Sequence, residues 1–81
     1  MGRPVFSVGS LVKFVDGTNE HVRGSVVVLT ELLPEGRWPT KDVPAWAGDY
    51  VLGPDGKPRD GFFLECVEST MAPYHGPDPR A

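Results

Sequence analysis

The sequence predicts an all-β protein: a small five-stranded, partly open barrel with a long loop and a C-terminal tail. Two observations point to this class. Ten glycines and nine prolines among 81 residues are more turn formers than a helical domain tolerates, while 40% hydrophobic residues are enough for a core. Short runs of β-branched and aromatic residues stand between the turn signals and favour strands over helices.

The length limits the chain to a single domain. Three prolines in the last nine residues, and the tendency of chain ends to be poorly ordered, indicate a flexible tail. We therefore assign residues 1–4 to an N-terminal arm, residues 5–68 to the barrel and residues 69–81 to the tail.

The first strand is predicted within the apolar segment 5–15. Strand side chains alternate with period two, so Val12 and Phe14 share one face, and Leu11, Lys13 and Val15 share the other. The polar stretch 16–21 opens with the turn dipeptide Asp-Gly and is expected to be a hairpin loop.

The second strand is predicted over residues 23–30. Its three consecutive valines, Val26 to Val28, are β-branched, which disfavours a helix and suits a pleated surface. Apolar residues on both of its faces indicate a strand that is partly covered on each side.

A long loop is predicted over residues 33–48. Its three prolines and two glycines disfavour both a regular helix and a central strand. Connections of this length in a compact domain tend to be functional. The only two tryptophans of the chain, Trp38 and Trp46, lie in this loop.

Short segments complete the predicted sheet. Residues 49–52 form a strand, residues 53–61 a turn-rich hairpin loop, residues 62–65 the return strand and residues 66–68 a last short pairing. The predicted core consists of Val12, Phe14, Val26, Val28, Tyr50, Leu52, Phe62 and Leu64. A core of this size rarely supplies more than about 3–5 kcal/mol, which makes a partner or a homodimer a natural source of further stability.

The order of these pieces resembles the Src-homology-3-like (SH3-like) small barrels, a broad group that includes Tudor, KOW and photosystem accessory-subunit barrels. The resemblance lies in segments 8–14 and 23–29, each with a glycine before the apolar residues of a strand, and in segment 63–68. A KOW-type resemblance implies RNA or ribosome contacts. The net acidic charge of this chain departs from that type of protein. A Tudor-type resemblance implies an aromatic cage, for which Trp38, Trp46 and Tyr50 are the available rings.

The charge balance limits the class of partner that the protein is expected to bind. Eight basic and eleven acidic side chains give a net charge of −3, whereas proteins that bind nucleic-acid phosphates usually carry a basic excess. Nucleic acid therefore ranks below protein as a partner.

Localisation is predicted from what the sequence lacks. No apolar run approaches the roughly 20 residues of a membrane-spanning helix, and no signal-peptide apolar region follows Met1. With one cysteine and hence no internal disulfide, the expectation is a cytoplasmic protein without a membrane partner. The absence of Ile and Gln is typical of a GC-rich coding sequence and favours a bacterial or phage origin.

No constellation of residues points to catalysis, a cofactor or a metal, so we expect a non-enzymatic protein without either. His21, Cys66 and His75 are too few for a structural zinc site, which needs about four ligands. Cys66 and His21 form the one Cys–His pairing, but the apolar neighbours of Cys66 favour a buried, unreactive thiol.

Two pairs of carboxylates are candidates for acid–base catalysis. Glu65 and Glu68, and likewise Asp55 and Asp60, stand close in the sequence. Because they fall at a strand end or in a turn, and because a small barrel offers little concave volume, a solvated surface is the simpler interpretation.

The two tryptophans carry the functional signal, with Arg37 and Lys41 beside them. One interpretation of either ring is a lid over the open barrel end. Alternatively it anchors a protein partner, because Trp and Arg dominate interface energetics and a proline-stiffened loop loses little entropy on binding. A third interpretation stacks the rings on unpaired bases, with Arg37, Lys41 and Arg23 at the phosphate backbone. Their spacing does not separate the three.

Phe62 and Phe63 supply a second signal. Alternation sends one ring inward and the other outward, and an outward Phe63 beside Glu65 would form a small exposed apolar patch. The edge of an incomplete barrel also offers a partner strand a place to pair.

These observations predict a non-enzymatic protein-binding module, an accessory subunit or a phage or mobile-element modulator of a larger host protein. The predicted partner-binding residues are Arg37, Trp38, Trp46 and Phe63. Acidic residues would meet a partner with a basic surface; they are Asp16, Glu20, Glu31 and Glu35. The alternative is a nucleic-acid-binding barrel, whose affinity would fall steeply with salt because counterions are released on binding.

Overall fold

The protein is built from one antiparallel sheet that curls around its own core. The computed structural model describes residues 4–15, 22–40 and 42–80. The strands are β1 (Leu11–Phe14), β2 (Val26–Leu32), β3 (Ala45–Leu52), β4 (Phe62–Val67) and β5 (Met71–Pro73), with two 3₁₀ turns, η1 (Glu35–Arg37) and η2 (Glu68–Thr70). The predicted five-stranded, all-β class is confirmed. The hairpin loop expected at 16–21 lies outside the described residues.

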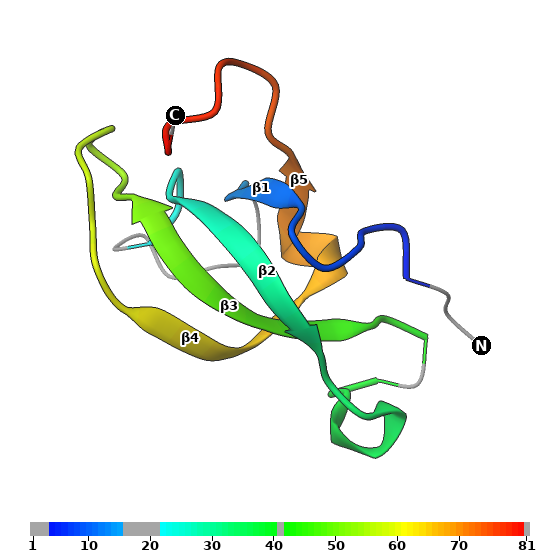
Figure 1. The fold of residues 1–81 in the computed structure, drawn as a ribbon. Helices are drawn as coiled ribbons and strands as arrows, with labels where there is room; N and C mark the ends of the chain where they lie inside the picture. Colours follow the sequence, from blue (N-terminus) through cyan, green and yellow to red (C-terminus); the bar gives the residue numbers. More distant parts are fainter. Residues whose placement is uncertain (1–3, 16–21, 41, 81) are drawn as a thin grey trace.

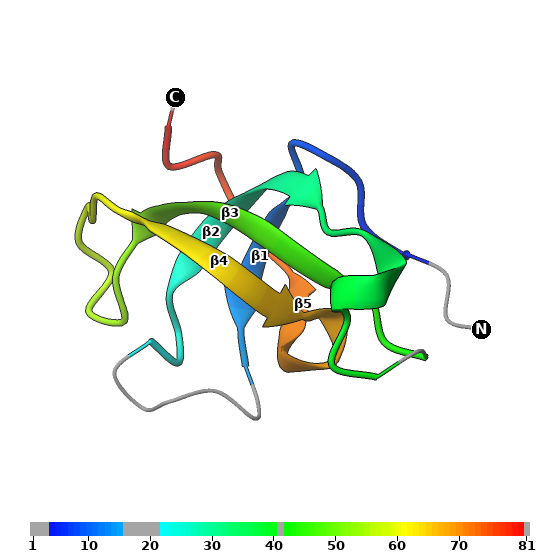
Figure 2. The same ribbon diagram turned by 90° about the horizontal axis from the view of Figure 1, so that it is seen from below.

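The strand order is β4-β3-β2-β1-β5 (Figure 1). The first four strands form an up-and-down meander, and the fifth returns to pair with the first: Phe14 lies opposite Met71. β4 and β5 are therefore the two edges of the sheet, and Figure 2 shows how strongly the strands between them curve. Among the described residues, no helix is long and apolar enough to cross a membrane.

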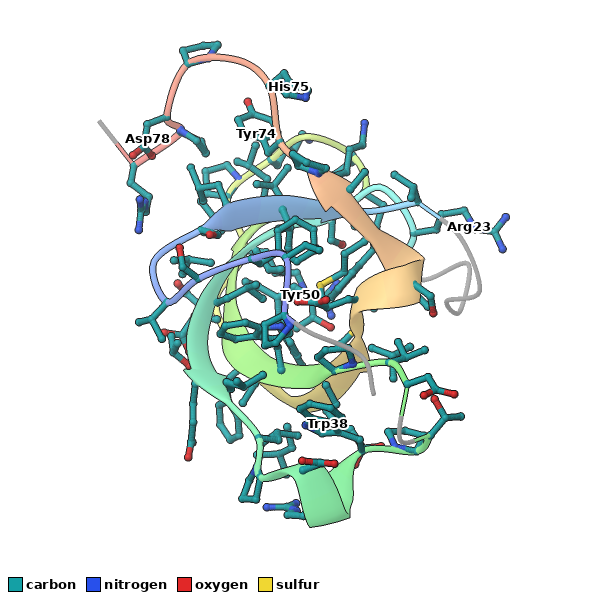
Figure 3. All side chains as sticks on the ribbon, turned by 90° about the vertical axis from the view of Figure 1, so that its right-hand side faces the viewer. Arg23, Trp38, Tyr50, Tyr74, His75 and Asp78 are labelled. Atoms are coloured by element: carbon teal, nitrogen blue, oxygen red, sulfur yellow. The ribbon has the colours of Figure 1, made fainter. Side chains whose placement is uncertain are left out.

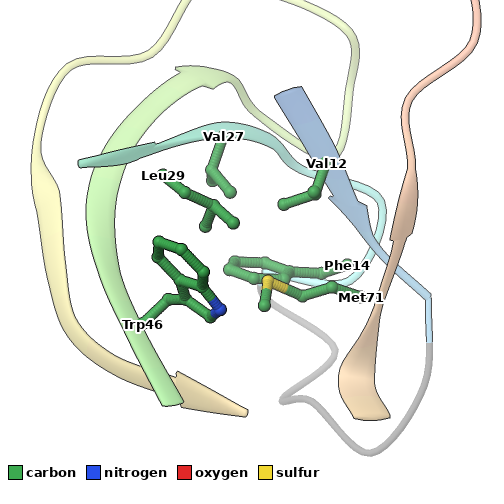
Figure 4. Packing of buried hydrophobic residues seen from close by; sticks show 6 residues of the cluster. All are labelled: Val12, Phe14, Val27, Leu29, Trp46 and Met71. Atoms are coloured by element: carbon green, nitrogen blue, oxygen red, sulfur yellow. The ribbon is translucent and has the colours of Figure 1, made fainter. Parts of the chain in front are cut away.

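The core lies inside this curl and draws on four strands. Its central cluster is shown in Figure 4 and consists of Val12, Phe14, Val27, Leu29, Trp46 and Met71. None of these six side chains is more than 7% exposed. The predicted core residues Val12, Phe14 and Val26 are buried, which confirms that part of the prediction.

The prediction for β2 is wrong for Val28. Val27 and Leu29 enter the cluster, while Val28 is only half-buried. Val27 lies directly opposite the inward Val12 of β1, and residues that face each other across a ladder share one face of the sheet. The pairing with β1 thus decides which valines of the apolar run point inward.

The prediction for β4 is also wrong: Phe62 and Leu64 are 68% and 67% exposed, and Phe63 packs against the core instead. The register between β3 and β4 shifts between Trp46 and Gly48, where Cys66 and Phe63 are the respective partners. One extra residue on β4 is accommodated there as a β-bulge, so Leu64 and Glu65 both face solvent while Phe63 and Cys66 both turn inward.

β3 begins at Ala45, four residues before the predicted strand start, so Trp46 belongs to a strand rather than to the long loop. Gly48, expected to be a loop residue, permits a close crossing of strands. A Cβ at this position would collide with the Val28 carbonyl and lie 2.8 Å from Cζ of Phe63. Small residues in this segment therefore let a neighbouring strand and a ring approach the β3 backbone.

The fifth strand lies at Met71–Pro73 rather than at residues 66–68. Met71 enters the core cluster and pairs with Phe14, so the segment assigned to the tail begins with a structural strand. Pro73 is compatible with this place because β5 is an edge strand, where a missing N–H is tolerated. The hairpin turn before β4 is as expected: Gly56 has φ 79°, and Asp55 Oδ1 accepts a hydrogen bond from the Lys57 N–H at 3.0 Å.

Candidate functional site

The most exposed apolar pair on the sheet is Phe62 and Leu64 of β4. Across the ladder, Phe62 lies opposite Asp49, and Asp49 lies opposite Val28 of β2. Since residues directly opposite share a face, these side chains form a row on the outer, convex side of the sheet. We call Val28, Phe62 and Leu64, with the half-buried Ala47 of β3, the outer-face patch.

Acidic residues lie within and beside the outer-face patch. Glu31 of β2, Asp49 of β3 and Glu65 of β4 are all exposed. The three strands contain no Lys, Arg or His at all. The nearest basic residue before β4 in the chain, Arg59, places its guanidinium over the Tyr50 ring, 4.3 Å from the centroid. The patch thus combines apolar and acidic side chains: Asp49 lies between Val28 and Phe62 in the same row.

The four residues predicted to bind a partner do not converge. Arg37 is exposed at the end of η1, and Trp38 follows it, half-buried, with its indole N–H donating to the Leu33 carbonyl at 2.9 Å. Figure 3 shows Trp38 beside η1, at the opposite end of the molecule from Tyr74 and His75. Arg37 and Trp38 therefore remain available as a second, small surface.

The other two predicted residues lie inside. Trp46 is 2% exposed. Phe63 makes edge contacts with Phe14 and Tyr50, with ring centroids 5.4 Å and 5.8 Å apart. In this arrangement both rings stabilise the barrel, and the ring available on β4 is that of Phe62. Sequence alternation predicts one outward ring; only the pairing of β4 with β3 identifies it.

A buried carboxylate holds the N-terminal segment against the core. Glu68 is 9% exposed, and its Oε2 accepts a hydrogen bond from the Trp46 indole N–H at 2.8 Å. The backbone N–H groups of Val5 and Phe6 also donate to this carboxylate, at 3.2 to 3.4 Å. Three N–H donors thus satisfy a buried acceptor, as buried polar groups require. Glu68 therefore has a structural role and is not paired with the exposed Glu65.

Cys66 packs against the core, in keeping with a structural thiol. Burial raises the pKa of the Cys66 thiol, although hydrogen bonds with Thr70 and with the Val67 backbone act in the opposite direction. The sulfur lies 3.1 Å from the Thr70 hydroxyl oxygen. A raised pKa lowers the fraction of thiolate, which is the nucleophilic form. His21, its suggested partner, lies outside the described residues.

Metal ligands do not gather in the part of the chain that the structure describes: no three His, Cys, Asp or Glu side chains are placed to share an ion.

Comparison of this chain with protein-family models, with curated proteins and with solved structures finds no match.

Proposed function

We propose that this chain is a non-enzymatic SH3-like barrel that binds another protein, as an accessory subunit or a phage or mobile-element modulator of a larger host protein. The SH3-like assignment is supported by the topology, a four-stranded meander whose fifth strand returns to the first. The cytoplasm is the proposed site of action.

One observation carries the protein-binding function: Phe62 and Leu64 are two-thirds exposed on the edge strand β4, and the charged residues of β2, β3 and β4 are all acidic. Apolar side chains surrounded by a polar rim are the usual composition of a protein interface. The proposed partner therefore presents apolar side chains bordered by Lys or Arg, in keeping with the basic partner expected from the acidic sequence.

The test is recovery of the tagged protein from a lysate of its own host, with and without nuclease. Phe62→Ser/Leu64→Ser is expected to lose a stoichiometric protein that the native chain retains after nuclease treatment. The matched control is Val5→Ser/Val8→Ser, which changes two side chains of similar exposure, 77% and 66%, outside the outer-face patch. Arg37→Ala/Trp38→Ala tests the second surface in the same experiment.

The outcomes separate the hypotheses. Loss of the partner in the Phe62/Leu64 variant alone supports the outer-face patch as the binding surface. Loss only in the Arg37/Trp38 variant supports protein binding but moves it to η1. Release of all bound material by nuclease overturns the proposal in favour of the nucleic-acid-binding barrel, whose affinity falls steeply with salt.

A further inference from the structure

We infer that the free edge of β4 accepts an added strand from its partner, an extended segment with apolar residues flanked by Lys or Arg. This inference rests on the proposed function and names the mode of binding and the kind of partner. β4 is the last strand of the sheet, and within the described residues its only strand neighbour is β3. At its C-terminal end the Val67 carbonyl already accepts the Thr70 hydroxyl at 2.7 Å. The free part of the edge is therefore the first half of β4.

The ladder geometry shows which backbone groups are free. The Tyr50 N–H donates to the Gly61 carbonyl at 2.9 Å, so these two residues form a hydrogen-bonded pair. Opposed residues in an antiparallel ladder alternate between hydrogen-bonded and non-hydrogen-bonded pairs. Phe62 opposite Asp49 is then a non-hydrogen-bonded pair and Phe63 opposite Gly48 a hydrogen-bonded one. The N–H and C=O of Phe62 and the N–H of Leu64 consequently point away from β3, toward the free edge.

The same two residues also present the exposed side chains. Phe62 and Leu64 are two positions apart on the outer face, which is the repeat of a strand. A strand added at this edge would place its own i and i+2 side chains next to these two. Main-chain hydrogen bonds and alternate side-chain contacts would thus be made together, as in other cases of binding by strand addition.

The charge around the β4 edge indicates which kind of segment pairs there. Glu65 lies on β4 itself, Asp49 lies on the neighbouring β3 and Glu31 lies one strand further on β2, and none of these three strands carries a basic residue. A second copy of this chain would bring its own Glu65 and a net charge of −3 to the same edge, which opposes β4–β4 pairing. A segment with Lys or Arg on either side of two apolar residues matches both the apolar and the acidic side chains of this surface.

The test uses a capped synthetic heptapeptide, Lys-Lys-Val-Thr-Val-Lys-Lys, titrated into the ¹⁵N-labelled full chain. Its odd positions place Lys, Val, Val and Lys on one face of a strand. We expect amide shifts centred on residues 62–65 and an affinity that falls with added salt. The same peptide with Glu in place of every Lys is the charge control and is expected not to bind.

Two further peptides separate edge pairing from contact with the face alone. One carries backbone N-methyl groups on both of its valines, the other on its even positions, so each blocks one edge of the added strand. Strand addition predicts that one of the two loses at least about tenfold in affinity while the other binds nearly as the parent. In the protein, Leu64→Pro removes the outward N–H and is expected to bind more weakly than Leu64→Ala; proline is tolerated at an edge position whose N–H faces solvent.

Three results would overturn the inference. Absence of shifts at millimolar peptide eliminates the basic segment as occupant. Equal binding of both N-methylated peptides shows a face contact without strand addition and leaves the proposed function intact. Concentration-dependent shifts of residues 62–65 without peptide identify a second copy of the chain as the occupant.

Discussion

The two faces of β4 have opposite roles although both are built from the same six-residue strand. On the inner face, Phe63 contacts Phe14 and Tyr50, and Cys66 packs against the core. On the outer face, Phe62 and Leu64 are two-thirds exposed beside acidic residues. Two identical side chains, Phe62 and Phe63, thus serve different purposes. Strand register, rather than residue type, therefore separates the stabilising residues of this protein from those exposed to a partner.

The two tryptophans also differ in role because they differ in position. Trp46 lies on β3 and packs in the core, and its indole N–H donates a hydrogen bond to Glu68. Trp38 stands just after η1 and is half-buried, with its indole N–H bound to the Leu33 backbone carbonyl. Inner and outer residues are expected to differ in their contribution to stability as they differ in position.

Trp46→Ala is expected to have the largest effect. Replacing a buried aromatic residue by alanine costs about 3–5 kcal/mol, which is as much as a core of this size supplies. We expect Trp46→Ala to be largely unfolded at 25 °C by near-ultraviolet circular dichroism. Trp46→Phe, which retains much of the volume, is expected to remain folded but less stable in urea. Trp38→Ala is the control. If Trp38→Ala and Trp46→Ala lost similar amounts of stability, the two tryptophans would not differ in structural role.

Phe63→Ala and Phe62→Ala compare the two faces of β4 directly. Phe63→Ala removes two aromatic contacts and leaves a cavity, at a cost of about 3 kcal/mol. Phe62→Ala changes an exposed side chain and is expected to shift the free energy of unfolding by only about 0.5 kcal/mol. Urea unfolding of both variants measures the difference. Greater loss with Phe62→Ala would show that the register between β3 and β4 is not the one described.

Glu68→Ala leaves the Trp46 indole N–H without its acceptor inside the core. An unsatisfied buried donor costs about 1–3 kcal/mol, and the N-terminal segment also loses its hydrogen bonds from Val5 and Phe6. We expect reduced stability in urea and faster hydrogen exchange at those two amides. Glu65→Ala is the matched control because Glu65 is exposed; its effect should be within about 0.5 kcal/mol. Unchanged exchange at Val5 and Phe6 in Glu68→Ala would contradict the role given to this carboxylate.

The smallest expected effect is a pH dependence from Cys66. Burial raises the pKa of its thiol, so the folded protein holds the proton at a pH where the unfolded chain has lost it. The resulting stabilisation is fully present below the unfolded pKa of about 8.5 and is lost as the pH rises toward the folded value. Relative to Cys66→Ala, the native chain should therefore lose stability progressively above that pH. Urea unfolding under reducing conditions at several pH values measures this; a constant difference between the two chains would count against a buried thiol.

Local signals predicted the elements whose residues have strong preferences of their own. The valine run of β2 forms a strand because β-branched residues suit a pleated surface. The Pro-Asp-Gly turn forms because proline and aspartate favour its first positions and glycine adopts the positive φ. Ala45 to Gly48 has no such preference. Its strand conformation comes from pairing with β2 and β4, so a local analysis places it in a loop.

The site was predicted only in part for the same reason. An exposed phenylalanine on β4 and an acidic surface follow from the sequence, but the bulge that turns both Leu64 and Glu65 outward depends on the β3–β4 register. The burial of Glu68 has no local signal either, since its partners Trp46, Val5 and Phe6 are distant along the chain.

The sequence by itself therefore determined the all-β class, the Pro-Asp-Gly turn before β4 and the acidic balance, because composition and local propensity act over a few residues. The tertiary structure decided which face of each strand became core, that residues 71–73 form the fifth strand, and that Phe62 and Leu64 remain outside. Strand side chains alternate with period two, so a shift of one residue exchanges the two faces. Only the partner strands, contributed by distant parts of the chain, can select between them.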